Sequence, residues 1–252
     1  MRIYAIQISS WSPSNDLYNT LLNLLDAPSQ SRIRQFVHRS DALRCLIGRL
    51  LPRYIISQET RCAFGDVQIE YSALGRPYCV SSQVPIDFNV SHDHDWVVMA
   101  CATAYALIAG WPDRGIVGID IMQNILPFGS HTSELVDTLA PQLSSDEQNR
   151  LRSSASVEAA LSIWTLKEAY AKLTGQGLRM DMRRCSFDTP SPGGRCTMHS
   201  SDEHEELEFS SRSGLIQGYT LSVAWHRSAG PLSQAIDQAW HAADFVRLLV
   251  KT

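Results

Sequence analysis

Two acidic residues occupy positions where the sequence otherwise predicts apolar core side chains. Asp120 lies in the run Val117–Ile121, whose apolar residues are typical of a strand. Glu168 lies in the stretch Ser156–Leu173, whose apolar stripe is typical of a helix. A charge inside a core is costly unless it is paired or binds a cation. Two carboxylates brought together there would form a hard-cation site, suited to Mg²⁺ and a phosphate-bearing substrate.

Each of these carboxylates also has a purely structural interpretation. A lone Asp on a strand usually serves a turn or a salt bridge. A Glu followed four residues later by a lysine, here Lys172, is normally one half of a surface ion pair. Glu168 shares its stripe with Trp164, which weakens the surface interpretation. A lysine beside a carboxylate–metal site can stabilise negative charge on a phosphoryl group.

The composition restricts the kind of partner that the chain can bind. The 252 residues are 44% hydrophobic, enough for a sizeable core, and the formal net charge is −4. This charge argues against bulk nucleic-acid binding, so any phosphate recognition must come from a local basic pocket. The six cysteines form no CxxC pair, which disfavours zinc and fits a reducing, cytoplasmic compartment. No run has the length of a membrane span, and the N-terminus lacks a signal-peptide core.

The first half of the chain predicts helices around a hairpin. Residues 1–9 alternate as a strand does, and helices are expected over 16–25 and over 29–57, the second one bent near Pro52. A hairpin of Ile86–Val90 and Trp96–Thr103 follows. The longer helix carries an arginine series that serves either as a solvated face or as a ligand-binding face: Arg32, Arg34, Arg39, Arg44, Arg49 and Arg53.

A break at Trp111–Gly115 predicts the boundary between two halves. The expected units are residues 1–113, residues 114–228 and a C-terminal helix within 229–252. Beyond the boundary the pattern predicts, in order, a strand at 116–122, a helix at 156–173, antiparallel strands at 206–210 and 215–226, and an amphipathic helix at 232–250.

Two further candidates for phosphate binding lie in the first half. Ser91 and His92 stand at the tip of the predicted hairpin, where an imidazole gains charge near an anion, although a histidine there is more often a solvated turn residue. Arg76 is held between Gly75 and Pro77, so its guanidinium would be rigidly presented for a bidentate phosphate contact.

The order of these motifs resembles the phosphopantetheinyl transferases of the surfactin-synthetase-activating type. The resemblance runs from about Met1 to Val223. Its specific part is a (V/I)GxD strand, here Val117–Asp120, followed some tens of residues later by a W-x-x-K-E-x-x-x-K helix, here Trp164–Lys172. Supporting matches are Phe88–His92, Gly75–Pro77 and the helix Arg32–Arg49 with Asp41 and Ala42.

The resemblance implies an activity and a set of site residues. Such enzymes move 4′-phosphopantetheine from coenzyme A to a serine of an apo carrier domain, as holo-[acyl-carrier-protein] synthases do, and release adenosine 3′,5′-bisphosphate. Asp120 and Glu168 would hold Mg²⁺, and Glu168 and Lys172 would act in catalysis. The coenzyme would be held by Arg32, Arg44, Arg76, Ser91, His92 and Lys172. Supporting roles would fall to Glu147, Trp164 and Lys167, with Glu147 close to the metal site.

The chain departs from the family pattern at two positions. Many bacterial members carry a third acidic ligand two residues after the strand Asp, whereas this chain has Met122 there. The methionine form looks like the broad-specificity branch, in which water fills the missing place, and it should bind Mg²⁺ more weakly. Ser29 stands where a basic residue often helps to hold the 3′-phosphate, so affinity for coenzyme A should be lower.

The resemblance implies an α+β protein of two pseudo-symmetric halves. Each half would pack helices on a small antiparallel sheet, with the active site between the halves in a monomer. A carrier should dock by a helix, which is commonly acidic, although the only basic region is Arg32–Arg53. Apolar docking is expected near Phe128 and Leu139–Leu143. The competing functions are a non-catalytic coenzyme A or carrier-binding homologue and an unrelated Mg²⁺-dependent phosphohydrolase.

Overall fold

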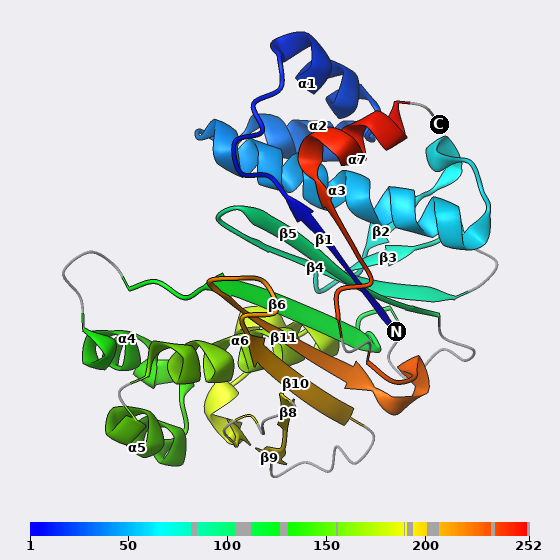
Figure 1. Ribbon diagram of the computed structural model, residues 1–252. Helices are drawn as coiled ribbons and strands as arrows, with labels where there is room; N and C mark the ends of the chain where they lie inside the picture. The colour runs from blue at the N-terminus through cyan, green and yellow to red at the C-terminus, as the bar shows by residue number, and fades with distance from the viewer. Residues whose placement is uncertain are drawn as a thin grey trace.

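Two four-stranded sheets lie between two layers of helices (Figure 1). The structure, a computed structural model, describes all residues except 82–84, 104–111, 127–130, 155, 189, 191–193, 201–206, 233–234 and 251–252. This mixed architecture with segregated helices and sheets confirms the predicted α+β class. Among the described residues, no helix combines the length and the hydropathy that crossing a bilayer requires.

The strands of each sheet come mainly from one half of the chain. The first sheet has the order β12 (Gln238–His241), β1 (Arg2–Gln7), β5 (Trp96–Thr103) and β4 (Ile86–Asp93). The second has the order β6 (Val117–Gln123), β11 (Tyr219–His226), β10 (Leu207–Ser213) and β8 (Arg195–Cys196). Two ribbons flank them: β2 (Ile69–Tyr71) with β3 (Pro77–Cys79), and β7 (Cys185–Phe187) with β9 (Met198–Ser200).

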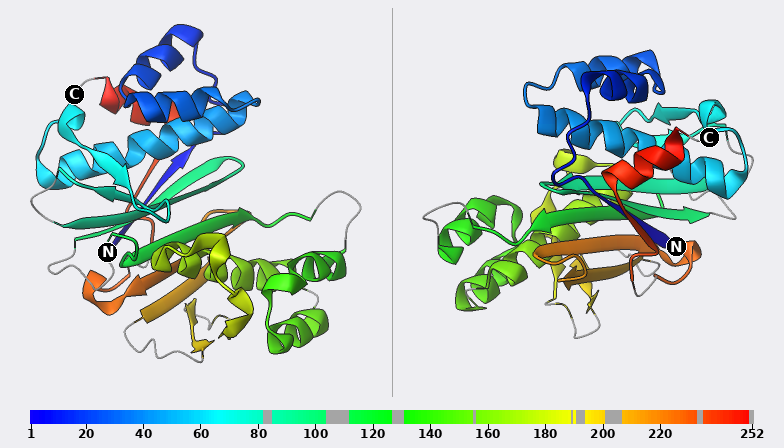
Figure 2. Two further views of the ribbon diagram at one scale, coloured as in Figure 1. Left: turned by 180° about the vertical axis from the view of Figure 1, so that it is seen from behind. Right: turned by 45° about the horizontal axis from the view of Figure 1, so that its top comes forward.

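The helices cover the outer faces of the two sheets (Figure 2). The first sheet carries α1 (Asn15–Asn23), α2 (Ala27–Arg34), α3 (Arg39–Thr60) and α7 (Ala242–Leu249). The second carries α6 (Val157–Thr174), flanked by α4 (Thr132–Leu139) and α5 (Ser145–Ser154).

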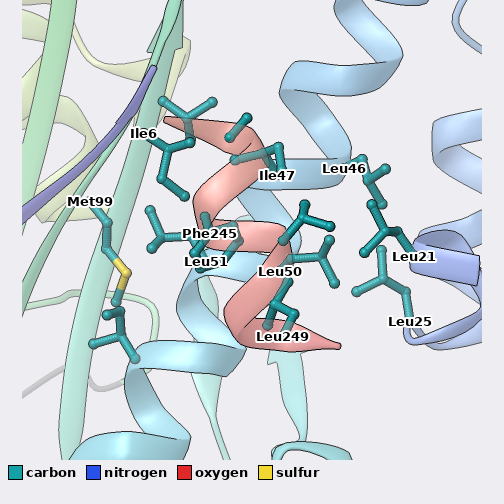
Figure 3. Packing of buried hydrophobic residues seen from close by; sticks show 14 of the residues in the cluster. Ile6, Leu21, Leu25, Leu46, Ile47, Leu50, Leu51, Met99, Phe245 and Leu249 are labelled. Carbon is teal, nitrogen blue, oxygen red and sulfur yellow. The ribbon is translucent and has the colours of Figure 1, made fainter. Parts of the chain in front are cut away.

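Alternation along β1 divides its side chains between two cores. Tyr4 and Ile6 face the helices, where Leu50 of α3 and Phe245 of α7 complete the packing (Figure 3). Ile3 and its alternate residues face the second sheet and form a separate apolar cluster between the sheets. This period of two is the physical reason why one strand can hold a helical layer and a second sheet together.

Side chains, not backbone pairs, join the edges of the two sheets. Strands β4 and β6 lie side by side but belong to different sheets. Alternate polar side chains of β4 accept hydrogen bonds from backbone N–H groups at the edge of β6 or just before it. The pairs are Asp87 with Ile116 (2.7 Å) and Val117 (3.0 Å), Asn89 with Ile119 (3.0 Å), and Asp93 with Gln123 (2.7 Å). This seam fixes the tip of the first hairpin against β6.

Gly118 allows α6 to lie directly on β6. A Cβ atom at this position would fall 2.0 Å from the carbonyl oxygen of Ala169 and 2.8 Å from the backbone nitrogen of Leu173. The Val-Gly-Ile-Asp strand therefore needs its glycine for close approach of a helix backbone.

We expect Gly118→Ala to destabilise the protein by roughly 1–3 kcal/mol, because the added methyl group must push strand and helix backbones apart. A lower urea midpoint for unfolding would show this. The control is Gly65→Ala, since a Cβ there meets nothing within 4 Å. Equal midpoints for the two variants would contradict the close approach.

Two predicted helices differ from the structure. The helix expected over 29–57 is two helices, α2 and α3, which break at residues 35–38 and pack against each other, while Pro52 lies inside α3. The helix expected over 232–250 is only α7, because Gln238–His241 instead pair in parallel with β1. An open strand edge satisfies its backbone groups by such pairing, and amphipathic pattern alone could not reveal it.

Candidate active site

The central cluster of the site joins β4, β6 and α6. The Lys172 ammonium lies 2.7 Å from Oδ1 of Asp120, and it also donates to the carbonyl oxygen of Ile119 at 3.1 Å. The Ser91 hydroxyl donates to the same Oδ1 at 2.7 Å. Asp120 points towards α6 because Ile119 and Ile121 take the opposite face of the strand and pack between the sheets. The cluster thus draws one residue from the first half and two from the second.

Glu168 lies one helical turn before Lys172, and its charge interacts with those of Asp120 and Lys172. Burial raises the pKa of the Glu168 carboxyl, and repulsion by Asp120 raises it further, while Lys172 opposes the rise. The side chain is half-buried and not fully enclosed. A desolvated carboxyl that is repelled by a second carboxyl is a group that a bound cation would relieve.

The oxygen atoms of this cluster suit Mg²⁺. Carboxylate and hydroxyl oxygens are hard donors, and Mg²⁺ usually retains several waters beside one or two carboxylates. Asp120, Glu168 and Ser91 supply such donors. Among the residues that the structure describes, no three or more His, Cys, Asp or Glu side chains lie together in a group that could hold a metal ion. Met122, two residues beyond Asp120, has no charge to offer, so water would fill the remaining positions.

A pocket of about 190 Å³ opens beside the cluster, between α3 and β4. Its polar lining includes His92, Arg49, Arg53 and Tyr71, and its walls are apolar. Desolvation lowers the pKa of His92, and the nearby cations Lys172 and Arg44 lower it further. The pocket therefore carries positive charge next to the carboxylates.

Arg44 and Arg32 lie at different places on the helical layer. Arg44 donates from Nη1 to the carbonyl oxygen of His94 at 2.7 Å and pairs with Asp41, so it fixes the hairpin tip to α3. Arg32 is exposed on α2 with its guanidinium carbon 5.6 Å from the ring centroid of Phe36. Ser29 is buried and bonds to Asp26, and therefore offers nothing to a ligand.

Arg76 has a different environment from the one expected of a phosphate ligand. It is 4% exposed, and its Nη1 lies 2.7 Å from Oδ1 of Asp87. Its Nη2 also donates to Oδ2 of Asp87 at 2.9 Å and to the carbonyl oxygen of Val117 at 3.1 Å. The guanidinium is thus a buried part of the seam between the sheets, where it neutralises the Asp87 charge. The Gly-Arg-Pro turn thus directs the Arg76 side chain into the interior, and not towards solvent as a phosphate contact would require.

Glu147 and Lys167 form a second buried ion pair rather than part of the central cluster. Lys167 Nζ lies 2.9 Å from Oε2 of Glu147, and their side chains are 1% and 0% exposed. Lys167 also donates to the carbonyl oxygens of Met182 (2.7 Å) and Cys185. Glu147 accepts from the backbone N–H of Phe187 at 2.8 Å. This network ties α5 and β7 to the helix that carries Glu168, and Trp164 packs on the same core.

Several residues of the site were not found from the sequence. Asp87, Asn89 and Asp93 bind the edge of β6, and their period-two spacing with apolar neighbours was the available signal. Arg49 and Tyr71 line the pocket, and only the general arginine series pointed to the first of them. Phe128, one of the expected docking residues, lies outside the described residues. Leu139 and Leu143 are buried in the core, so docking on these two is ruled out.

Each half of the chain matches a family of known proteins. Residues 9–104 match the family described as "4'-phosphopantetheinyl transferase, N-terminal", and residues 116–224 match the "4'-phosphopantetheinyl transferase superfamily". The 4'-phosphopantetheinyl transferase pptA of Paxillus involutus is 33% identical over 198 residues, which cover 75% of this chain and 73% of that protein.

Animal and bacterial proteins match as well. The L-aminoadipate-semialdehyde dehydrogenase-phosphopantetheinyl transferase of Xenopus laevis is 32% identical over 73% of this chain and 61% of its own length. The 4'-phosphopantetheinyl transferase ffp of Bacillus subtilis is 26% identical over 92% and 95%. The family models and these relatives place the protein among the transferases. The chain belongs to the 4′-phosphopantetheinyl transferase superfamily.

Proposed function

We propose that this protein transfers the 4′-phosphopantetheine group of coenzyme A to a serine of an apo carrier-protein domain, with Mg²⁺ as its metal. The observation that carries the proposal is the cluster of Asp120, Lys172, Ser91 and Glu168, which assembles two carboxylates and a lysine beside a cationic pocket. Family membership supports the same chemistry. The products are a phosphopantetheinylated carrier serine and adenosine 3′,5′-bisphosphate.

The proposed reaction is a phosphoryl transfer in which one bond forms and one breaks. The oxygen of the carrier serine attacks the β-phosphorus of coenzyme A. The bond from this phosphorus to the bridging oxygen breaks, and that oxygen leaves with adenosine 3′,5′-bisphosphate. Mg²⁺, when bound, supplies charge neutralisation at the pyrophosphate. Such reactions require mainly positioning and electrostatic stabilisation from the protein.

The residues of the cluster have separate roles in this proposal. Asp120 and Glu168 hold the metal, and Glu168, or a water that it orients, accepts the proton of the serine hydroxyl. Lys172 moves from its contact with Asp120 to the negative charge that develops on the transferred phosphoryl group. His92 and Ser91, which lie in the last residues of β4 before the hairpin tip and not at the tip itself, bind coenzyme A, and the exposed Arg32 approaches its 3′-phosphate. Arg44 acts by fixing the tip.

Mass spectrometry of an apo carrier domain tests the proposal. The carrier is incubated with this protein, coenzyme A and Mg²⁺, and we expect a gain of one phosphopantetheine group. The gain should disappear with EDTA and with Asp120→Ala. Carrier types from fatty-acid, polyketide, nonribosomal-peptide and aminoadipate-reductase systems are compared. No gain with any of them, while coenzyme A still binds, would favour the non-catalytic alternative.

A reaction without carrier separates the proposal from a phosphohydrolase. That alternative predicts release of pantetheine phosphate from coenzyme A in the presence of Mg²⁺ alone. The transferase proposal predicts that adenosine 3′,5′-bisphosphate is released only when the carrier serine is present, with the phosphopantetheine group bound to the carrier. With a carrier in which alanine replaces this serine, no product should form. Product release with the alanine carrier would contradict the transferase.

A further inference from the structure

The turn between α2 and α3 combines an unusually exposed apolar side chain with unneutralised positive charge. Val37 is 92% exposed, more than any other large apolar residue among those described. Residues 27–40 contain three arginines and no acidic residue, in a chain whose net charge is −4. A single exposed valine is ordinary, but its position inside a basic segment of an acidic protein is not explained by folding.

The arginines of this turn are available to a partner. The flanking acids Asp26 and Asp41 already pair with Arg53 and Arg44. In the part of the chain that the structure describes, neither Arg34 nor Arg39 makes an ion pair. Arg39 lies with its guanidinium carbon 3.6 Å from the ring centroid of Tyr18, which holds the side chain in place, and Arg34 is exposed. Arg34 follows Arg32 by two residues, so the two project from opposite sides of α2.

The turn lies at the end of α3 that contacts the tip of the β4–β5 hairpin. Arg44 stands five residues after Arg39, about 7.5 Å further along α3. It donates a hydrogen bond to His94 at the hairpin tip, next to His92 and Ser91. Figure 1 shows the α2–α3 turn and the β4–β5 tip on the same side of the molecule. A macromolecule bound at the turn would therefore reach the carboxylate cluster without leaving this side.

From these observations we propose that Val37, Arg34 and Arg39 form a docking surface for the protein acceptor of the reaction. This inference rests on the proposed function. The surface fits an acidic helix that carries an exposed apolar residue, because it offers the exposed Val37 side chain between Arg34 and Arg39 in the sequence. Complementary charge steers such a partner and fixes its orientation, and the apolar contact adds burial at the centre.

Acceptor kinetics test this surface directly. Val37→Asp and Arg34→Glu should each raise the KM for an apo carrier about tenfold or more and leave the Kd for coenzyme A within about twofold of wild type. Both side chains are exposed, so neither change disturbs packing. The matched control is Val250→Asp, which places the same charge on an exposed valine beyond α7 and should change neither constant.

Charge reversal provides the second measurement. A carrier in which one acidic residue of its docking helix is replaced by arginine should be modified poorly by the wild-type enzyme and better by Arg34→Glu. Unchanged KM values in both variants, with an active wild type, would overturn the surface and leave the transferase intact. A weaker Kd for coenzyme A with normal KM for the carrier would assign the turn to the coenzyme instead. If the wild type modifies no carrier, the transferase fails and the docking surface fails with it.

Discussion

Replacing Glu168 by glutamine should lower the rate of phosphopantetheine transfer by about 100-fold or more while it raises the stability of the metal-free protein. The loss of rate follows because glutamine has neither the charge to hold Mg²⁺ nor the basicity to accept a proton. A change of this size is typical when one electrostatic group of an active site is removed. Near-normal turnover in this variant would disprove the metal-site assignment.

The gain in stability follows from the direction of the Glu168 pKa shift. Burial and Asp120 raise the pKa of this carboxyl above its ordinary value of 4.5 in the folded protein. The folded state therefore binds the proton more tightly than the unfolded state, and wild-type stability falls as the pH rises from 4.5 through the folded pKa. Glutamine cannot ionise, so the difference in stability between variant and wild type should widen over this range and persist at neutral pH.

Thermal unfolding in EDTA at pH 5 and pH 7.5 measures this effect. The Tm of Glu168→Gln should exceed that of wild type more at pH 7.5 than at pH 5. Glu158→Gln provides the control, because Glu158 is exposed in the first turn of the same helix. A Tm advantage that is equal at the two pH values would show that the effect has another origin than the ionisation of Glu168.

Breaking the buried pair of Glu147 and Lys167 should destabilise the fold more than any other single charge neutralisation we consider. Glu147→Gln leaves the Lys167 ammonium buried without a counter-charge, and such changes cost about 3–5 kcal/mol. Urea unfolding gives the free energy directly. Activity should fall as well, because Lys167 ties Met182 and Cys185 to the helix turn that carries Glu168.

Two comparisons distinguish this pair from an ordinary salt bridge. Asp137→Asn breaks the exposed pair with Arg152, whose side chains are 65% and 51% exposed, and should cost less than about 1 kcal/mol. The double variant Glu147→Gln and Lys167→Met removes the stranded charge and should recover part of the lost stability. If Glu147→Gln lowered the free energy of unfolding no more than Asp137→Asn does, the buried pair would not contribute to the stability of the fold.

Local pattern predicted the elements that carry the cluster. The strand around Asp120 and the helix around Glu168 were found from periodicity because each places apolar residues on one face and so reports burial directly. The helix over 29–57 was predicted with the wrong break, since the turn at residues 35–38 exists to let α2 pack on α3. Residues 238–241 became a strand because β1 had an open edge beside them.

Sequence alone determined the family of this protein and the two elements that carry its carboxylates. Motif spacing does this because a strand that needs Gly118 for close approach and a helix that carries Lys172 in its last turn can place Asp120 and Glu168 in only a few ways. Tertiary structure alone decided what the other charges do. Arg76 was expected to hold coenzyme A, and Glu147 was expected close to the metal site. In the structure, Arg76 neutralises Asp87 and Glu147 pairs with Lys167 in the interior. Residue type says that a charge needs a partner, but only the packing of distant segments decides which partner it meets.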